Sequence, residues 1–214
     1  MREYPKIESL FDRDEKFKVV VGKWRLPEFE YLQSNQWLFT EKVDGTNVRV
    51  HWDGEKVRFG GRTDNAQMPV FLLAKLQELF PAKAFLDSAH PEQEMILFGE
   101  GYGAKIQKGG GNYIPDGVDF ILFDVLVPDV ATGKEWWLRR QDIEDVADAF
   151  GLNCVPIIAR GTLAEAVELV RPGLQSRCSI NANLAAEGLV LRPEVDIMTR
   201  SGHRIIAKIK TKDF

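Results

Sequence analysis

Lys42 stands at the end of an apolar segment and is followed by Val-Asp-Gly, a sequence with the chemistry of a tight turn. A lysine amine is a nucleophile once it is deprotonated, and neighbouring positive charge or desolvation lowers its free pKa of ~10.4. The tetrapeptide alone is weak evidence, because it also fits a hairpin whose lysine is simply solvated. The chemistry of Lys42 therefore depends on the residues that accompany it.

Side chains suited to a phosphorylated ligand follow Lys42 along the chain. Arg62, in the sequence Gly-Gly-Arg-Thr, is expected on the outgoing strand of the hairpin that Lys42 enters, as a bidentate donor to a phosphate or a ribose. Glu100 is a carboxylate at the end of an apolar strand, where a charge is costly unless it serves a ligand or a partner. Phe120 offers an aromatic face that could stack on a base.

The C-terminal part of the chain adds another carboxylate and a pair of lysines. Glu187 leads into an apolar strand, with Arg192 behind it. Lys208 and Lys210 share one face of a strand, because they lie two positions apart. Each residue has a plain structural alternative: core packing for Phe120, an arginine partner for either carboxylate, and an exposed strand face for the lysine pair. The complete set is much harder to reach by chance.

Turn signals and hydrophobic periodicity predict the elements that position these residues. Turns are expected at Asp44-Gly45 and Asp53-Gly54, the second as a strong hairpin signal. Apolar, β-branched and aromatic segments predict strands over 37–42, 45–52, 56–62, 95–103, 118–127, 155–160, 188–193 and 204–210. Helical spacing predicts helices over 69–80, 140–150 and 162–170.

The helix ends carry their own signals. Gly151 suits the C-terminal cap of the helix over 140–150, and Thr162 with Glu165 forms a capping box at the start of the next helix. Strands outnumber helices, and tight turns join most of them. The pattern therefore predicts an α+β domain built on antiparallel sheets, rather than a doubly wound parallel sheet.

Length and composition exclude several classes of protein. The 214 residues suggest one domain or at most two small ones. No stretch approaches the ~18 consecutive apolar residues that a spanning helix needs, and the charged N-terminal segment with Pro5 does not resemble a secretory signal. Cys154 and Cys178 cannot build a disulfide framework or a metal cluster. A reducing, cytoplasmic location is therefore expected.

The charge distribution is more informative than the net charge of −4, which does not suit a general polyanion binder. The segment 200–212 contains five basic residues and one histidine without an acid, and Lys105 and Lys108 lie in a glycine-rich segment. Solvated surface is the plain alternative for both segments. Local basic clusters in an acidic protein indicate a phosphate-bearing ligand held at one place.

The ordered set KVDG, GGRT, FGEGYG, DFILFD, EGLVLR and KIK resembles the nucleotidyltransferase motifs of polynucleotide ligases and mRNA capping enzymes. Within that superfamily, EKVDGTN followed by GRT resembles the ATP-dependent RNA ligases, in particular the phage-type catalytic domain. The resemblance extends from Glu41 to Lys210. It implies an antiparallel-sheet, ATP-grasp-like ligase adenylation fold, with residues 1–214 as a single nucleotidyltransferase domain. No OB domain is expected, because the chain ends shortly after Lys210.

The resemblance also implies roles for individual residues. Lys42 would be the nucleophile that becomes lysyl-AMP. Lys208 and Lys210 would contact the α-phosphate and lower the pKa of Lys42. The residues implied to bind the nucleotide are Glu41 and Asn47 beside the adenylate, Arg62 at the ribose or phosphate, Glu100 at the ribose hydroxyls, Phe120 on the adenine, and Glu187, which would also place the metal.

The cofactors implied by the resemblance are ATP and Mg²⁺, with Mn²⁺ as an alternative metal. The adenylate would pass to the 5′-phosphate of an RNA, and a 3′-hydroxyl would then displace AMP and seal the strand. The partners expected are RNA ends, together with a partner protein or a second copy of the chain that helps to grip nucleic acid. No membrane partner is expected.

Two alternatives remain open at this stage. A minimal DNA ligase or a guanylyltransferase would use the same covalent chemistry on another substrate, and would reveal itself by sealing nicked DNA or by labelling with GTP. A non-catalytic nucleotide-binding or nucleic-acid-binding module would bind ATP reversibly without a covalent adduct. The intact lysine nucleophile, both carboxylates and both terminal lysines argue against the second alternative.

Overall fold

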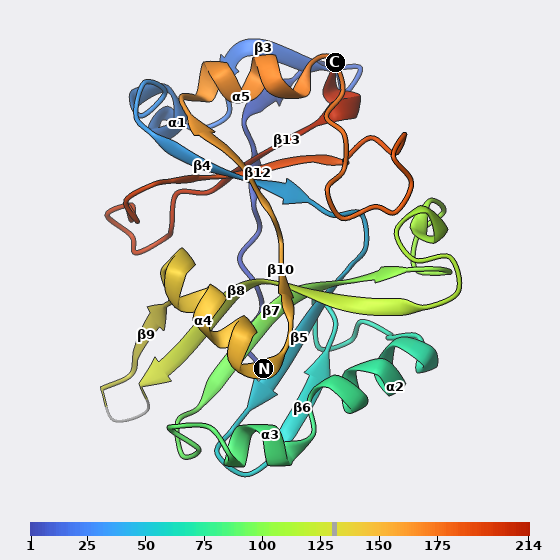
Figure 1. Cartoon of the computed structure of the whole chain (residues 1–214). Coiled ribbons are helices and arrows are strands. Elements are labelled where there is room, and N and C mark those ends of the chain that lie inside the picture. The colour runs from blue at the N-terminus through green and yellow to red at the C-terminus, as the bar shows by residue number, and fades with distance from the viewer. Residues whose placement is uncertain (130–131) are drawn as a thin grey trace. The chain divides into compact units, whose positions relative to one another are not determined.

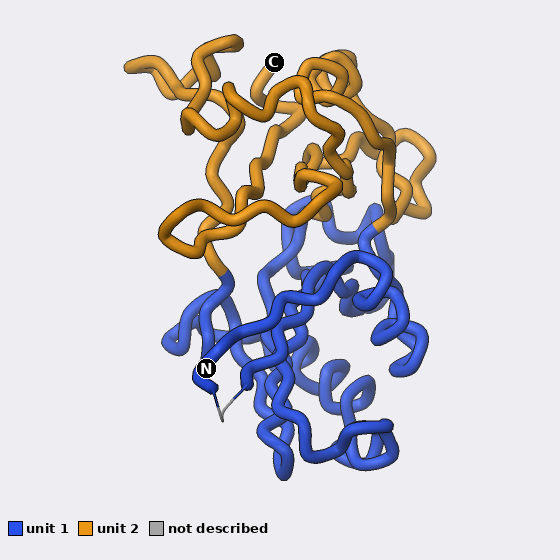
Figure 2. The backbone as a smooth tube through the Cα atoms, turned by 90° about the vertical axis from the view of Figure 1, so that its left-hand side faces the viewer, with its two compact units in different colours: residues 1–4, 44–155 blue, residues 5–43, 156–214 orange. Residues whose placement is uncertain are grey.

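A computed structural model describes residues 1–129 and 132–214 of the chain. The chain forms two compact units, which are coloured separately in Figure 2. Unit 1 comprises residues 1–4 and 44–155, and unit 2 comprises residues 5–43 and 156–214. The single nucleotidyltransferase domain expected from the sequence stays a prediction.

Unit 1 is built on one twisted sheet with the strand order β10-β8-β7-β5-β6, and β9 pairs with β8 (Figure 1). Its strands are β5 Thr46–Trp52, β6 Val57–Gly60, β7 Met95–Gly103, β8 Val118–Asp129, β9 Lys134–Trp137 and β10 Asn153–Cys154. Its helices are α2 Val70–Leu79, α3 Ala82–Leu86, α4 Arg140–Phe150 and the short η1 Gly110–Asn112.

The sheet of unit 1 has two different faces, because successive side chains of a strand point to opposite sides. One face packs against α2, α3 and α4, with Val48, Leu76, Leu97 and Ile143 in a single core cluster. On the other face a smaller cluster of Ile96, Phe98 and Leu126 packs against Tyr4 and neighbouring aromatic rings. Helices therefore cover only one side of this sheet.

Unit 2 is built on a five-stranded sheet with the order β1-β13-β12-β4-β11, and on a separate two-stranded hairpin. The sheet strands are β1 Glu8–Ser9, β4 Trp37–Lys42, β11 Ile157–Gly161, β12 Gly188–Pro193 and β13 Ala207–Lys210. The hairpin consists of β2 Phe11–Arg13 and β3 Val19–Trp24, and the helices are α1 Pro27–Tyr31, α5 Leu163–Val170 and the short η2 Thr211–Asp213.

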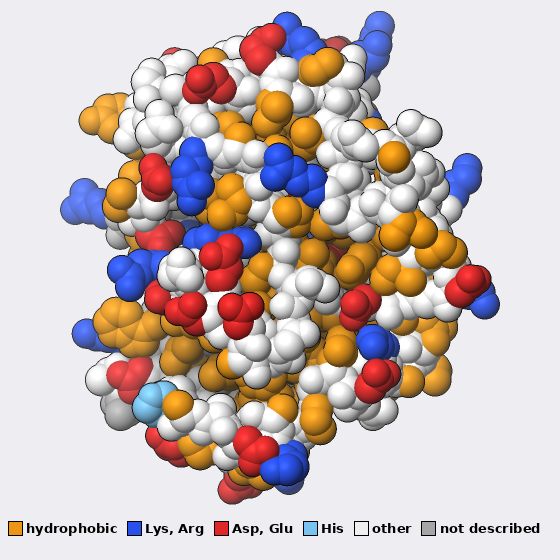
Figure 3. Space-filling view, viewed as in Figure 1, with side chains coloured by type: hydrophobic (Ala, Val, Ile, Leu, Met, Phe, Trp, Pro, Cys, Tyr) orange, Lys and Arg blue, Asp and Glu red, His pale blue; other side chains and the backbone are white. Residues whose placement is uncertain are grey.

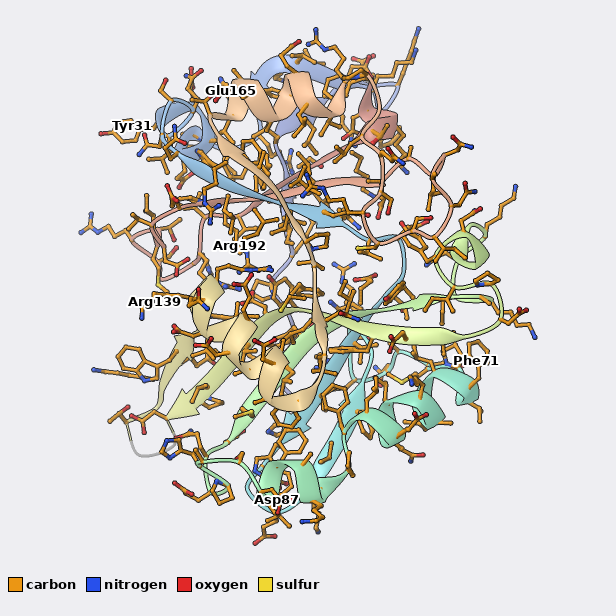
Figure 4. The ribbon with its side chains drawn as sticks, viewed as in Figure 1. Tyr31, Phe71, Asp87, Arg139, Glu165 and Arg192 are labelled. Atoms are coloured by element: carbon orange, nitrogen blue, oxygen red, sulfur yellow. The ribbon has the colours of Figure 1, made fainter. Side chains whose placement is uncertain are left out.

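Helix α5 packs its apolar face on the sheet of unit 2, where Leu163, Ala166 and Val170 are fully buried with Leu189. The expected capping box closes its N-terminus: the Thr162 side chain accepts from the Glu165 N–H, and the Glu165 carboxylate accepts from the Thr162 N–H. Figure 4 labels Glu165 on this helix. The predicted helix start is therefore confirmed.

Most of the expected elements are confirmed. β7 covers 95–103, β12 covers 188–193 and α4 covers 140–150, as predicted, and Gly151 adopts the left-handed conformation with φ of 64°. Both sheets are largely antiparallel, but β1 runs parallel to β13 and β10 runs parallel to β8. Both parallel pairings involve strands of only two residues.

Several expectations about pairing and length are wrong, and one of them is that the strand expected over 56–62 covers only Val57–Gly60. Asp44-Gly45 does not close a hairpin, because β4 pairs with β11 and β12 of unit 2, whereas β5 pairs with β6 and β7 of unit 1. The last strand begins at Ala207 rather than at position 204, and β11 begins at Ile157 rather than at position 155. Local turn chemistry marks a change of direction, but the sheet that a strand joins depends on distant partners.

No helix within residues 1–129 and 132–214 combines the length and apolar character that crossing a membrane requires.

Candidate active site

Lys42, Glu187 and Lys210 meet at one end of the sheet of unit 2. The central strand β12 lies between β4 and β13, and Gly188 is paired in register with both Lys42 and Lys210. The residue before Gly188 is therefore flanked by the two lysines. The Lys42 Nζ lies 2.5 Å from the Glu187 Oε2, and the Lys210 Nζ lies 2.5 Å from the Glu187 Oε1.

A glycine makes this close approach of backbones feasible. Gly188 has a φ of 155°, and a Cβ atom at this position would lie 2.0 Å from the carbonyl oxygen of Ile209. No side chain fits at that distance, so the packing of β12 against β13 requires glycine at position 188. The Glu187 carbonyl also accepts the N–H of Thr211, which follows Lys210.

Opposite charges stabilise this cluster in a half-buried environment. Burial raises the pKa of Glu187, but the charge of Lys42 and the hydrogen bonds from Lys210 and Lys42 outweigh it, so the pKa lies below its usual 4.5. The side chains of Glu187, Lys42 and Lys210 are only 17%, 23% and 22% exposed. Glu187 is therefore an ionised carboxylate that holds two ammonium groups close together.

Lys208 lies on the same face of β13 as Lys210. Both are half-buried, whereas Ala207 and Ile209 between them are buried on the opposite face. Lys208 is paired in register with Ser9 of β1 and with Val190 of β12. The alternation predicted for the lysine pair is confirmed.

Glu41 points to the other side of β4 from Lys42 and is 1% exposed. Its carboxylate accepts hydrogen bonds from the Ser176 Oγ at 2.5 Å and from the Arg177 N–H at 2.7 Å. Burial, together with the charge and hydrogen bonding of Glu41, raises the pKa of the nearby Cys178 thiol to about 12. Glu41 thus holds the segment before β12, a contact that no local sequence signal indicates.

Asn47 and Glu100 form a pair in unit 1. They are directly opposite each other on the antiparallel strands β5 and β7, and so share one face of the sheet. Asn47 Oδ1 is buried, and it has no hydrogen-bond partner among the residues that the structure describes. Buried acceptors are nearly always hydrogen bonded, so this atom is suited to a donor supplied by a ligand.

The turn after Lys42 rests on the strand that carries Glu100. A Cβ atom at Gly45 would lie 2.4 Å from the Gly101 carbonyl oxygen and 2.7 Å from the Glu100 Cγ. The Asp44 N–H donates to the Tyr113 hydroxyl at 3.3 Å, and the Gln107 Nε2 donates to the Gly45 carbonyl at 2.8 Å. The glycine of the Lys-Val-Asp-Gly motif is therefore needed for packing within unit 1.

The structure does not bring Phe120 to Asn47 and Glu100. Register places Ile121 opposite Glu100, so Phe120 points to the other face of the sheet. Phe120 is 1% exposed, its ring lies 5.2 Å from that of Phe80, and a Cβ at Gly99 would come within 2.2 Å of it. The structure therefore shows the plain alternative for Phe120, which is core packing. The apolar neighbour of Glu100 is instead Ile121.

Arg62 does not lie on a strand that pairs with that of Lys42. β6 ends at Gly60, pairs with β5, and leaves Arg62 in an exposed segment of unit 1. Arg49, which is fully buried, holds this segment by donating to the Gly61 carbonyl at 2.6 Å and to the Asp64 carboxylate at 2.8 Å. The position of Arg62 is set by Arg49, which sequence reasoning did not single out.

The residues described contain no group of three or more His, Cys, Asp and Glu side chains that could hold a metal ion. Glu187 is a single carboxylate between two lysines. A Mg²⁺ ion is commonly bound through one or two carboxylates together with the phosphates of its nucleotide. Both Glu187 oxygens contact lysines, so a metal that arrives with a phosphorylated ligand would bind Glu187 by exchanging one of these contacts.

Comparison with known proteins gives a family match and a fold match. A family model described as RNA ligase matches residues 35–210. An RNA ligase mutant of Naegleria gruberi solved with ATP and manganese has a TM-score of 0.62 and 20% sequence identity over 98% of this chain. Another mutant, solved with AMP and manganese, has a TM-score of 0.63 and 19% identity over 98% of this chain. The chain spans 58% of the length of each.

Proposed function

The chain belongs to the RNA ligase family, and we propose that it is an ATP-dependent RNA ligase that forms lysyl-AMP on Lys42. The observation that carries the proposal is the contact of the Lys42 Nζ with Glu187, which Lys210 shares. An amine held by a carboxylate beside a second ammonium group is positioned to meet a negatively charged phosphate. The fold similarity to the Naegleria gruberi structures supports the same assignment.

In the first step the Lys42 ammonium group gives up one proton to solvent, and the resulting amine attacks the α-phosphorus of ATP. A P–N bond forms, the bond from the α-phosphorus to the bridging oxygen breaks, and pyrophosphate leaves with that oxygen, while the attacking nitrogen loses a second proton to solvent. Glu187 orients the amine through the 2.5 Å contact, and Lys210 and Lys208 lie on the strand face from which they can neutralise charge on the phosphate.

Three of the residues assigned to the nucleotide, Asn47, Glu100 and Arg62, belong to unit 1. Asn47 Oδ1 can accept a hydrogen bond from the nucleotide, since it is buried without a partner among the described residues. Glu100, opposite Asn47 on the sheet, is placed to accept from the ribose hydroxyls. Arg62 is exposed and can reach the ribose or a phosphate without breaking core contacts. Glu41 acts indirectly, by fastening the segment of Ser176 and Arg177.

A divalent metal is part of the proposal. The Naegleria gruberi structures with ATP or AMP contain manganese, which supports Mg²⁺ or Mn²⁺ as the metal here. Glu187 is the carboxylate that would hold it, together with the phosphates of ATP. When bound, such a metal neutralises charge that develops on the transferred phosphate.

The later steps define the substrate. The adenylate passes to the 5′-phosphate of an RNA, and a 3′-hydroxyl attacks that activated phosphate and releases AMP. Residues 1–214 would act in these steps as one nucleotidyltransferase domain of the ATP-grasp-like adenylation type. The match of the RNA ligase family model to residues 35–210, which include every assigned residue, supports this assignment.

The test is covalent labelling. The purified chain is incubated with Mg²⁺ and either α-labelled ATP or α-labelled GTP, and the adduct is located by mass spectrometry. We expect ATP to label Lys42, and Lys42→Ala to abolish the label. Lys83→Ala, which removes an exposed lysine from α3, is the matched control and should leave labelling intact. Adding 5′-phosphorylated RNA or DNA then identifies the strand that is sealed.

Each outcome is decisive. Labelling by GTP instead of ATP would identify a guanylyltransferase, and sealing of nicked DNA but not RNA would identify a DNA ligase. Reversible ATP binding with no covalent adduct would identify a binding module and refute the proposal.

A further inference from the structure

Unit 2 contains a hollow of about 540 Å³ that the site described above does not include. The tip of the β2–β3 hairpin, the end of α5 and η2 line it, and Figure 1 shows β3 close to the C-terminal η2. Its lining residues are Arg13, Phe17, Lys18, Val19, Val21, Arg171, Lys212, Asp213 and Phe214. We refer to this set as the hairpin hollow.

The hairpin hollow is held together by one buried carboxylate. The Asp213 side chain is 3% exposed, accepts from the Arg13 guanidinium at 2.6 Å, and accepts from the Lys210 N–H at 3.0 Å. The same Arg13 donates to the Phe17 carbonyl at 2.8 Å. The hairpin tip, η2 and the end of β13 are therefore linked through Arg13 and Asp213.

The charged side chains of the hollow are mostly cationic. Four cations line it. Arg13 pairs with the buried Asp213, the one acidic side chain of the lining, and Arg171 lies 3.5 Å from the Glu168 carboxylate, so the positive charge offered to a ligand comes mainly from Lys18 and Lys212. Figure 3 shows basic and acidic side chains interspersed over the face that it draws. A cationic hollow in a chain of net charge −4 is suited to bind phosphate groups.

Exposed aromatic rings accompany these cations. Phe17 is 80% exposed and has a φ of 61°, a left-handed conformation that a bulky side chain rarely adopts. Phe214 is 43% exposed, and Arg171 lies over its ring at 5.6 Å. A ring that is held in a strained turn but buries little of its surface has no packing role within the chain. It is suited to stack on a base.

We propose that the hairpin hollow binds a single-stranded segment of RNA, with Lys18, Arg171 and Lys212 at its phosphates and Phe17 against a base. Alternating cations and exposed rings are how proteins bind single strands without sequence preference. Lys212 lies two residues beyond Lys210, so an RNA held here is connected through η2 to the strand of the catalytic lysines. The inference rests on the proposed function for the identity of the strand as RNA.

The experiment measures RNA binding without ATP, so that its result does not depend on lysyl-AMP formation. Binding of a labelled RNA of about 12 nucleotides is followed by fluorescence anisotropy at about 50 and 200 mM salt. One variant combines Lys18→Ala with Lys212→Ala, and the other is Phe17→Asn, because asparagine tolerates a positive φ. The matched controls are Lys83→Ala with Lys134→Ala, and Tyr31→Asn.

The lysine double variant should flatten the dependence of log affinity on log salt by about 1.4, since each lost phosphate contact in a single strand contributes ~0.7. Phe17→Asn should weaken binding roughly tenfold, as expected for one lost stacking contact. Tyr31 is 87% exposed and projects outward from α1 (Figure 4), so its variant should bind RNA as the unmodified chain does.

Equal effects of hollow and control variants would overturn the inference. It would also be overturned if Phe17→Asn abolished self-association in sedimentation experiments while RNA binding persisted, because the hollow would then bind a second copy. If RNA binding depends on the hairpin hollow but ATP never labels Lys42, the proposed ligase function is refuted, whereas the assignment of the hollow as an RNA-binding surface still holds.

Discussion

The two units hold their predicted site residues in different electrostatic states. In unit 2 the charged groups satisfy one another, because Glu187 contacts both Lys42 and Lys210. In unit 1 the buried Asn47 Oδ1 has no partner within the described residues. A ligand that binds unit 2 must therefore exchange existing ion pairs, whereas a ligand that binds unit 1 can fill an unsatisfied hydrogen bond. The ion-paired lysines of unit 2 are suited to contact a charged phosphate, and the unpaired acceptor of unit 1 is suited to recognise a hydrogen-bond donor of a ligand.

The largest expected effect comes from removing the charge of Glu187. Glu187→Gln leaves two ammonium groups close together without their carboxylate, so the amine of Lys42 loses its orienting partner. We expect the rate of lysyl-AMP formation to fall at least ~100-fold. Quench-flow labelling with α-labelled ATP measures this rate. Glu194→Gln, at a half-exposed carboxylate of unit 2, is the control, and an equal loss there would contradict the role of Glu187.

Glycine substitutions compare the packing of the two units. Gly188→Ala in unit 2 and Gly45→Ala in unit 1 would each place a Cβ within 2.4 Å of a carbonyl oxygen. We expect each to lower the free energy of unfolding by about 3 kcal/mol. Chemical denaturation measures the loss.

The matched controls for these substitutions have open space around them. Gly22 has a φ of 87°, but a Cβ atom there would have no atom within 4 Å. Gly22→Ala therefore tests the backbone strain without a clash, and it should lower the free energy of unfolding by about 1 kcal/mol. Gly111 has neither a positive φ nor an atom within 4 Å of the added Cβ, so Gly111→Ala should leave the free energy of unfolding nearly unchanged. If Gly22→Ala destabilised unit 2 as much as Gly188→Ala, close packing of β12 and β13 would not be the reason for Gly188.

A smaller effect should follow from replacing Asn47, whose buried Oδ1 has no hydrogen-bond partner among the described residues. Asn47→Leu is similar in shape and removes the buried Oδ1, so the folded chain should keep or slightly gain stability. ATP affinity should fall roughly tenfold, because one hydrogen bond to the ligand is lost. Isothermal titration measures the affinity and thermal unfolding measures the stability. A loss of stability with unchanged ATP affinity would show that Asn47 has only a structural role.

The smallest effect is a pH dependence of unit 2. The pKa of Glu187 in the folded chain lies below its usual 4.5, so its ion pairs stabilise the fold above that pH. This contribution is lost as the pH falls through the lower, folded value. The difference in unfolding free energy between the unmodified chain and Glu187→Gln should therefore shrink between about pH 6 and 3. A difference that stays constant over this range would contradict the ion-pair assignment.

The sequence alone determined the local features of this protein. Thr162 with Glu165, Gly151 at the end of α4, and the apolar runs of β7 and β12 were predicted, because caps and alternation depend on a few consecutive residues. The ordered motifs also identify the segments of Lys42 and Glu187 in the sequence, although not the contact between the two side chains.

Only the tertiary structure decided which side chains meet. It separated β4 from β5, turned Phe120 into the core, and placed Ile121 beside Glu100. It also assigned Ser176 as the partner of Glu41 and joined the hairpin tip to η2 through Arg13. The physical reason is register: a shift of one residue reverses every side chain of a strand, and distant partners, rather than neighbours in the chain, set that register.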